Sequence, residues 1–107
     1  MTAPITDPTV KAAIEALNAH DSKAWDALFT PGATFSDDGH EGSLSNFSNN
    51  AFGKGKERFT AIDKVENNGL DVYGRLHSDS WGDFKAYFKF RVKDGRITRL
   101  EVGQANY

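Results

Sequence analysis

Hydrophobic residues recur at helical spacing near the start of the chain. Asp7 followed by Pro8 is typical of a helix start, because the aspartate can accept from free backbone N–H groups and proline fits the first turn. We therefore predict a helix from Pro8 to Ala19. Its apolar face carries Val10, Ala13, Ile14 and Leu17.

Two further helices are predicted before the middle of the chain. Asp21 or Ser22 can cap the first of them, which Pro31-Gly32 would end. Ala33 to Ser36 is then a short strand candidate, and Ser43 can cap the next helix. The apolar faces of the two helices carry Trp25, Leu28 and Phe29, and Leu44, Phe47, Ala51 and Phe52, respectively.

The period of the pattern changes from helical to alternating after the glycine-rich segment 53–56, which we interpret as a mobile connection and not as a phosphate loop. Turns at Asn67-Asn68-Gly69 and Asp94-Gly95 separate the predicted strands. A change of spacing between Leu100 and its neighbours indicates a β-bulge in the last strand. The inward positions are Phe59, Ala61, Val65, Leu70, Val72, Gly74, Leu76, Phe84, Ala86, Phe88, Phe90, Val92, Ile97, Leu100 and Val102.

Helices followed by a strand meander predict an α+β fold, with the helices on one face of an antiparallel sheet. The chain has 107 residues, which suits one domain spanning 1–107. Of these, 13 are basic and 15 acidic, so no positive field would attract nucleic acid. There is no cysteine, and neither a membrane span nor the apolar core of a signal peptide is visible, so we expect a cytoplasmic protein.

Four segments together resemble one protein family. They are Ala16 to Asp21 (ALNAHD), Trp25 to Phe29 (WDALF), Ala33 to Phe35 (ATF), and Asp94 to Ile97 (DGRI) with Leu100 after it. In this order and spacing they resemble the SnoaL-like branch of the nuclear transport factor 2-like superfamily. The resemblance implies a cone-like (cystatin-like) fold, with helices closing a curved sheet around an apolar pocket, and a homodimer formed through the sheet. Its members include isomerases, cyclases, hydrolases, dehydratases and non-catalytic binding proteins.

The resemblance also implies a candidate catalytic carboxylate. In the steroid isomerase pattern a general-base aspartate follows the first short strand, and Asp37 is in register with it. A carboxylate at the mouth of an apolar pocket would have a raised pKa and could exchange protons. The alternative is that Asp37-Asp38-Gly39 is simply a turn. His40 could share a proton with Asp37 or Asp38, or could be a solvated loop residue.

Other catalytic sets of the family are incomplete in this chain. Ala13 and Ala86 occupy the positions where the steroid isomerase pattern has a tyrosine and a protonated acid, and Tyr87 should point to the opposite face. Arg75 and Arg91 fall on the predicted outer face, so the epoxide hydrolase cluster is not supported. The histidines lack metal-ligand spacing, and we expect neither a metal nor a cofactor.

Aromatic residues are numerous on the predicted inward faces, and they could either line a pocket or fill it. Two hypotheses follow. One is a small-molecule pocket protein, an isomerase, cyclase or lyase for an apolar substrate, with Asp37 and His40 as catalytic residues. The other is a non-catalytic binding or dimerisation module. The candidate substrate-binding residues are Trp25, Phe29, Phe52, Phe59, Phe88 and Phe90.

Overall fold

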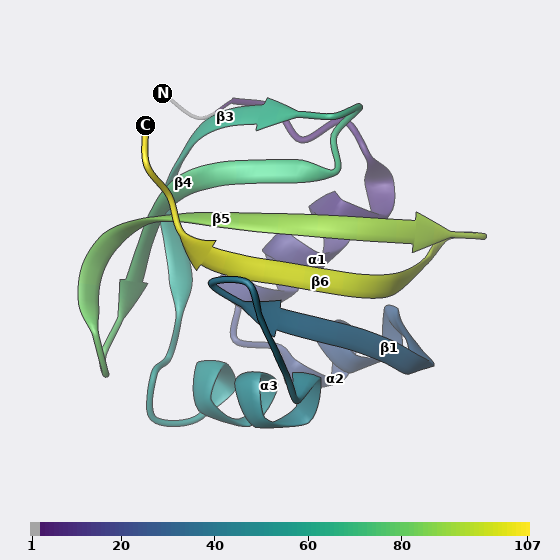
Figure 1. Cartoon of the computed structure of the whole chain (residues 1–107), viewed down its shortest axis with the longest axis horizontal. Coiled ribbons are helices and arrows are strands. Elements are labelled where there is room, and N and C mark those ends of the chain that lie inside the picture. Colours follow the sequence, from purple (N-terminus) through teal and green to yellow (C-terminus); the bar gives the residue numbers. More distant parts are fainter. Residues whose placement is uncertain (1–2) are drawn as a thin grey trace.

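The computed structural model describes residues 3–107 as three helices and six strands that form one sheet (Figure 1). Met1 and Thr2, which the single-domain and leader predictions also cover, lie outside the described residues. No helix within residues 3–107 is long and apolar enough to cross a membrane. The elements are α1 (Pro8–Asn18), α2 (Ser22–Ala27), β1 (Phe29–Asp37), β2 (His40–Gly42), α3 (Leu44–Phe52), β3 (Arg58–Glu66), β4 (Asp71–Ser78), β5 (Gly82–Lys93) and β6 (Arg96–Gln104).

Each helix begins at a polar cap that the sequence predicts. The Asp7 carboxylate accepts from the backbone N–H groups of Thr9 and Val10, at 3.0 and 2.9 Å. Asp21 caps α2 in the same way, and the Ser43 hydroxyl accepts from the third residue of α3 at 3.2 Å. These bonds satisfy N–H groups that have no partner inside the helix, and so they set where each helix starts.

The sheet is curved and its strand order is β2-β1-β6-β5-β4-β3, with the helices on one side of it (Figure 1). All neighbouring strands are antiparallel except β1 and β6, which are parallel. The prediction of a wholly antiparallel sheet is therefore wrong at this one pairing. The cause is topological, because the chain leaves β2 through α3, starts a new meander at the far edge and returns with β6 beside β1.

The first strand begins earlier than the sequence pattern predicts. Helix α2 ends at Ala27, and Phe29 already pairs with Ile97 of β6. Pro31-Gly32 lies inside β1, where the register shifts between Phe29 and Thr34. Proline has no N–H to donate, so it is tolerated where the ladder is interrupted. The prediction that Phe29 belongs to the second helix is wrong, because Phe29 pairs with Ile97 of the returning strand.

The alternation predicted for β4 and β5 is confirmed. In β3 the prediction that Ala61 faces inward is wrong, because the register shifts between Phe59 and Ala61 and Ile62 is buried in its place. Val72, Gly74 and Leu76 of β4 are buried, as are Ala86, Phe88 and Phe90 of β5. The bulge is confirmed as well, since Arg91 pairs with Arg99 but Val92 pairs with Ile97, which leaves Thr98 as the extra residue. The apolar face of the sheet is thus continuous and lies against the helices, while Arg75 and Arg91 are exposed on the outer face.

Candidate functional site

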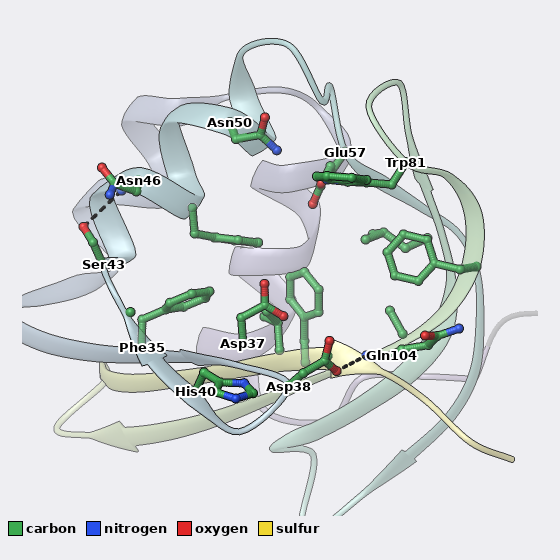
Figure 2. Close-up of a pocket in the computed structure, with 18 of the residues that line it drawn as sticks. Phe35, Asp37, Asp38, His40, Ser43, Asn46, Asn50, Glu57, Trp81 and Gln104 are labelled. Carbon is green, nitrogen blue, oxygen red and sulfur yellow. Dashed lines mark hydrogen bonds between the residues drawn. The ribbon is translucent and has the colours of Figure 1, made fainter.

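A pocket of about 930 Å³ opens between the end of β1, helix α3 and the β4–β5 turn (Figure 2). Its walls carry five aromatic side chains, and the rings of Phe35 and Phe47 stack there at 4.9 Å between centroids. Four acidic residues also line it, whereas no lysine or arginine is among its described lining residues. The aromatic lining residues are Phe35, Phe47, Trp81, Phe84 and Phe88, and the acidic ones are Asp37, Asp38, Glu41 and Glu57.

Asp37 lies at the end of β1 and its carboxylate points into the pocket (Figure 2). It pairs with Val102 of β6 and with His40 of β2, so strands on both sides hold its backbone. Desolvation by the pocket walls raises the pKa of Asp37, the negative charge of Asp38 raises it further, and His40 lowers it. The carboxylate remains open to solvent, as an acid or base that exchanges protons must be.

A turn was the alternative interpretation of Asp37-Asp38-Gly39. Asp38 and Gly39 do form a turn, and Asp37 comes directly before it. Asp38 and Gly39 have φ angles of 48° and 83°, in the left-handed region that a two-residue hairpin requires. The Asp38 carboxylate accepts from the backbone N–H of Gln104 at 2.9 Å, and its own N–H donates to Val102 at 2.9 Å. Asp38 is therefore a structural residue, and its hydrogen bonds leave Asp37 as the last residue of the strand.

His40 begins β2 directly across the turn and lines the pocket beside Asp37 (Figure 2). It is exposed to solvent. Its effect on the neighbouring carboxylate is to lower the pKa of Asp37. The geometry brings together the two predicted catalytic residues at one edge of the pocket.

Glu57 is a lining residue that the sequence analysis missed. It lies just before β3 and points into the pocket from the wall opposite Asp37 (Figure 2). Its exposed fraction is 5%, and no other acidic or basic residue of the described chain is buried. The signal was available, because Glu57 stands two residues before the inward-facing Phe59 and alternation places both on the same face.

Burial is also the largest influence on the acidity of Glu57. Desolvation raises the pKa of its carboxyl, a hydrogen bond from the Ser78 hydroxyl lowers it, and the negative charge of Asp37 raises it again. Asp37 and Glu57 therefore form an electrostatically linked pair in one pocket. The open member is Asp37 and the buried member is Glu57.

The glycine-rich segment before Glu57, which the sequence predicts to be a mobile connection, is hydrogen-bonded to its neighbours. Gly55 donates from its N–H to Asn50 at 2.8 Å and accepts from Asp79 at 2.6 Å. Glu57 donates from its backbone N–H to Ala51 at 2.9 Å. A Cβ on Gly55 would lie 3.0 Å from the Asn50 oxygen and 3.2 Å from Cγ of Glu57. The lack of a side chain at Gly55 thus leaves room for the Glu57 side chain.

The β4–β5 turn places Trp81 at the rim of the pocket. The indole is 75% exposed and lines the mouth (Figure 2). At the base of the turn His77 binds Asp83 through Nδ1 at 2.5 Å and Asp79 through Nε2 at 2.7 Å. These hydrogen bonds raise the pKa of His77, Asp83 having the larger effect. These two hydrogen bonds therefore hold the β4–β5 turn together at its base.

The candidate substrate-binding aromatics do not gather in the pocket. Of the six, only Phe88 lines it. Trp25, Phe59 and Phe90 are buried in the core, and Phe52 packs against Trp25 at 5.6 Å between ring centroids. Phe29 lines a separate hollow of about 370 Å³. Strand alternation identified the inward face, but it does not distinguish the filled end of the cone from its open end.

The structure also places the residues that stand where the steroid isomerase pattern has a tyrosine and a protonated acid. Ala13 is buried in α1, and Ala86 lines the pocket without a polar group. Tyr87 lies on the outer face, where its side chain packs over Gly103. Burial raises the pKa of Tyr87, and the negative charge of Asp38 adds to the effect. Within residues 3–107 no three His, Cys, Asp or Glu side chains are grouped in a way that could hold a metal ion.

No protein-family model and no curated protein matches the chain. Solved structures do match it. An NTF2-like protein of unknown function from Cytophaga hutchinsonii is 23% identical, with a TM-score of 0.71 over 98% of this chain and 95% of that one. A candidate polyketide cyclase from Sinorhizobium meliloti is 21% identical, with a TM-score of 0.72 over 88% and 92%. A candidate ketosteroid isomerase from Kribbella flavida is 11% identical, with a TM-score of 0.71 over 95% and 78%.

These similarities extend over nearly all of the chain, and they agree with the resemblance seen in the sequence. At such identities they establish shape and not chemistry. The chain therefore has the NTF2-like fold, shared with proteins described as candidate polyketide cyclases and ketosteroid isomerases.

Proposed function

We propose that this protein binds an apolar small molecule in the pocket and moves a proton on it with Asp37, as an isomerase, cyclase or lyase of the SnoaL-like kind. The observation that carries the proposal is an open carboxylate of raised pKa among aromatic walls. Aromatic walls favour a flat apolar ligand, and a carboxylate at the edge can take or return a proton. His40 beside it would lower the pKa of that carboxylate.

The experiment uses 2-acetylnaphthalene, a flat ketone with exchangeable protons next to its carbonyl, in deuterated buffer. We expect the protein to accelerate hydrogen–deuterium exchange at the methyl group, followed by NMR. Asp37→Asn should lower that rate by about 100-fold or more, because a positioned base contributes 10²–10⁴ to proton transfer. Asp94→Asn is the matched control and should leave the rate unchanged, since Asp94 lies in the β5–β6 turn and not among the residues that line the pocket.

The alternative function is a non-catalytic ligand-binding module of the same fold. The filled end of the cone favours it, since the aromatic side chains of Trp25 and Phe90 are buried there. If the ketone binds but its protons exchange at the rate in buffer alone, the module is the better description. An exchange rate that Asp37→Asn leaves unchanged would also exclude Asp37 as the base.

We also propose a homodimer formed through the outer face of the sheet. Rows of cationic and aromatic side chains cover that face, with Lys89 over Tyr87 and Lys85 over Tyr107 at 5.3 and 4.7 Å. Sedimentation equilibrium should give twice the chain mass of 11.8 kDa. Arg91→Glu on this face should weaken the dimer about tenfold or more, and Lys11→Glu on α1 should not. A monomer at all concentrations would contradict the proposal.

A further inference from the structure

We propose that Glu57 is a protonated carboxyl that donates a hydrogen bond from the wall of the pocket to an acceptor oxygen on the bound molecule. This inference rests on the proposed ligand-binding function, because it assigns a role to a second residue of the same pocket. It gives the ligand a chemical class, a flat apolar molecule with a neutral oxygen acceptor such as a carbonyl.

The first step concerns the charge that Glu57 can carry. Glu57 as a whole residue is 5% exposed, and an ionised carboxylate taken out of water needs a cation or several donors. Lys56 and Arg58 flank it in the chain, but both are exposed and their charges lower the pKa of Asp79 instead. The charged group that acts on Glu57 from across the pocket is Asp37, and it is negative. The neutral form of Glu57 is therefore favoured.

The second step concerns where the proton of Glu57 can point. Ser78 is 1% exposed, and its Oγ accepts from the backbone N–H groups of Ser80 and Trp81 at 3.2 and 3.3 Å. A hydroxyl oxygen has two acceptor positions, and these two N–H groups occupy both of them on Ser78. The carboxyl proton of Glu57 thus has no acceptor in Ser78. This proton is therefore available to an acceptor in the pocket.

The third step concerns how firmly the donor is held. The backbone N–H of Glu57 donates to Ala51 in α3, and Phe59 two residues later is buried against the ring of Phe88 at 4.9 Å. A donor held from two sides loses little freedom when it binds a ligand. Asp37 and Glu57 thus form a pair with different roles, an open base and a buried acid.

The experiment compares matched probes that have the same outline. 2-Acetylnaphthalene carries a carbonyl oxygen, 2-isopropenylnaphthalene replaces that oxygen with a CH₂ group, and 1-(2-naphthyl)ethylammonium carries a cation. Dissociation constants are measured by NMR titration across the pH range. We expect the wild-type protein to prefer the ketone to the alkene about tenfold, the value of one buried hydrogen bond. The preference should disappear as pH rises through the pKa of Glu57.

Two variants test the donor itself. Glu57→Gln keeps an N–H donor that does not titrate, so it should prefer the ketone at every pH. Glu57→Met keeps the length without a donor, so it should bind both naphthalenes equally. An ammonium preference that is lost in Glu57→Gln, or a ketone preference that survives in Glu57→Met, would overturn the inference.

A ligand-free measurement separates this inference from the proposed function. The side-chain carboxyl carbons of the wild-type protein are titrated by ¹³C NMR, and the Glu57 signal should titrate above its ordinary value of 4.5. It should move toward that value in Asp37→Asn, because a neighbouring negative charge is removed. A Glu57 signal that titrates at or below the ordinary value overturns the inference even if the ketone binds. If neither naphthalene binds, the pocket function fails, while the carboxyl titration still decides the protonation of Glu57.

Discussion

Replacing Trp25 by alanine is expected to lower the free energy of unfolding by about 3–5 kcal/mol, the cost of removing a large buried aromatic. Trp25 is 0% exposed, and its ring packs against Phe29 and Phe52 at 5.0 and 5.6 Å between centroids. Its indole N–H donates to the Ser48 hydroxyl in α3 at 3.0 Å. This one side chain therefore joins α2, α3 and the start of β1. Chemical denaturation at constant pH measures the loss.

The other tryptophan of the chain supplies a matched control. Trp81 is 75% exposed, so Trp81→Ala should change the free energy of unfolding by no more than about 0.5 kcal/mol. Trp25→Phe separates packing from hydrogen bonding, and it should cost about 1–3 kcal/mol, because the Ser48 hydroxyl loses its partner and a small cavity remains. Equal losses in Trp25→Ala and Trp81→Ala would show that Trp25 is not the central support of the helical layer.

Gly74→Ala is expected to destabilise the protein by about 3 kcal/mol, although it adds a single methyl group. A Cβ at this position would overlap the backbone oxygen of Ala61 and would lie 3.0 Å from Cδ1 of Phe59. The oxygen belongs to β3, whose register against β4 shifts between Phe59 and Ala61. Backbone cannot move aside as a flexible side chain can, so β3 must separate from β4. Thermal or denaturant unfolding measures this loss.

Gly32→Ala is the control for the second prediction. No atom lies within 4 Å of a Cβ built there, so we expect a change within about 0.5 kcal/mol. We expect Gly74→Ala to disturb the pocket as well, because the displaced Phe59 is two residues from Glu57 in the pocket wall. Similar stabilities for the two alanine variants would contradict the close approach of β3 to β4.

The pH dependence of the free energy of unfolding is a further test of the raised pKa of Glu57. A carboxyl whose pKa is raised by folding stabilises the protein below its unfolded pKa, and that contribution is lost as pH rises through the folded pKa. For Glu57 the window begins near 4.5 and extends upward. Glu57→Gln, which does not titrate, should therefore gain stability relative to the wild-type protein as pH rises above this value.

Local rules were enough to predict most elements of the fold. Caps at Asp7, Asp21 and Ser43 start the helices where the sequence predicts, because such caps depend only on neighbouring backbone groups. Alternation on β4 and β5 identified the buried face of the meander, because side chains on successive residues of a strand must point to opposite faces. The same logic placed Arg75 and Arg91 outside.

Rules of local capping and alternation could not predict the parallel pairing of β1 with β6. It depends on where the chain returns after α3 and the meander, which no local period records. The early start of β1 at Phe29 has the same cause, since Ile97 of the returning strand pairs with it. Long-range pairing overrode the helical spacing of Trp25, Leu28 and Phe29.

The same distinction between local and long-range effects applies to the candidate site. By itself the sequence determined the inward face and, through its resemblance to known proteins, Asp37 with His40 at the edge of a cone. Only the tertiary structure decided that Trp25, Phe59 and Phe90 fill the core while Phe88 borders the pocket, and that Glu57 lies opposite Asp37. The reason is physical: alternation and caps act between neighbours in the chain, whereas burial and the pKa of a carboxyl depend on whatever distant segments the fold brings around it.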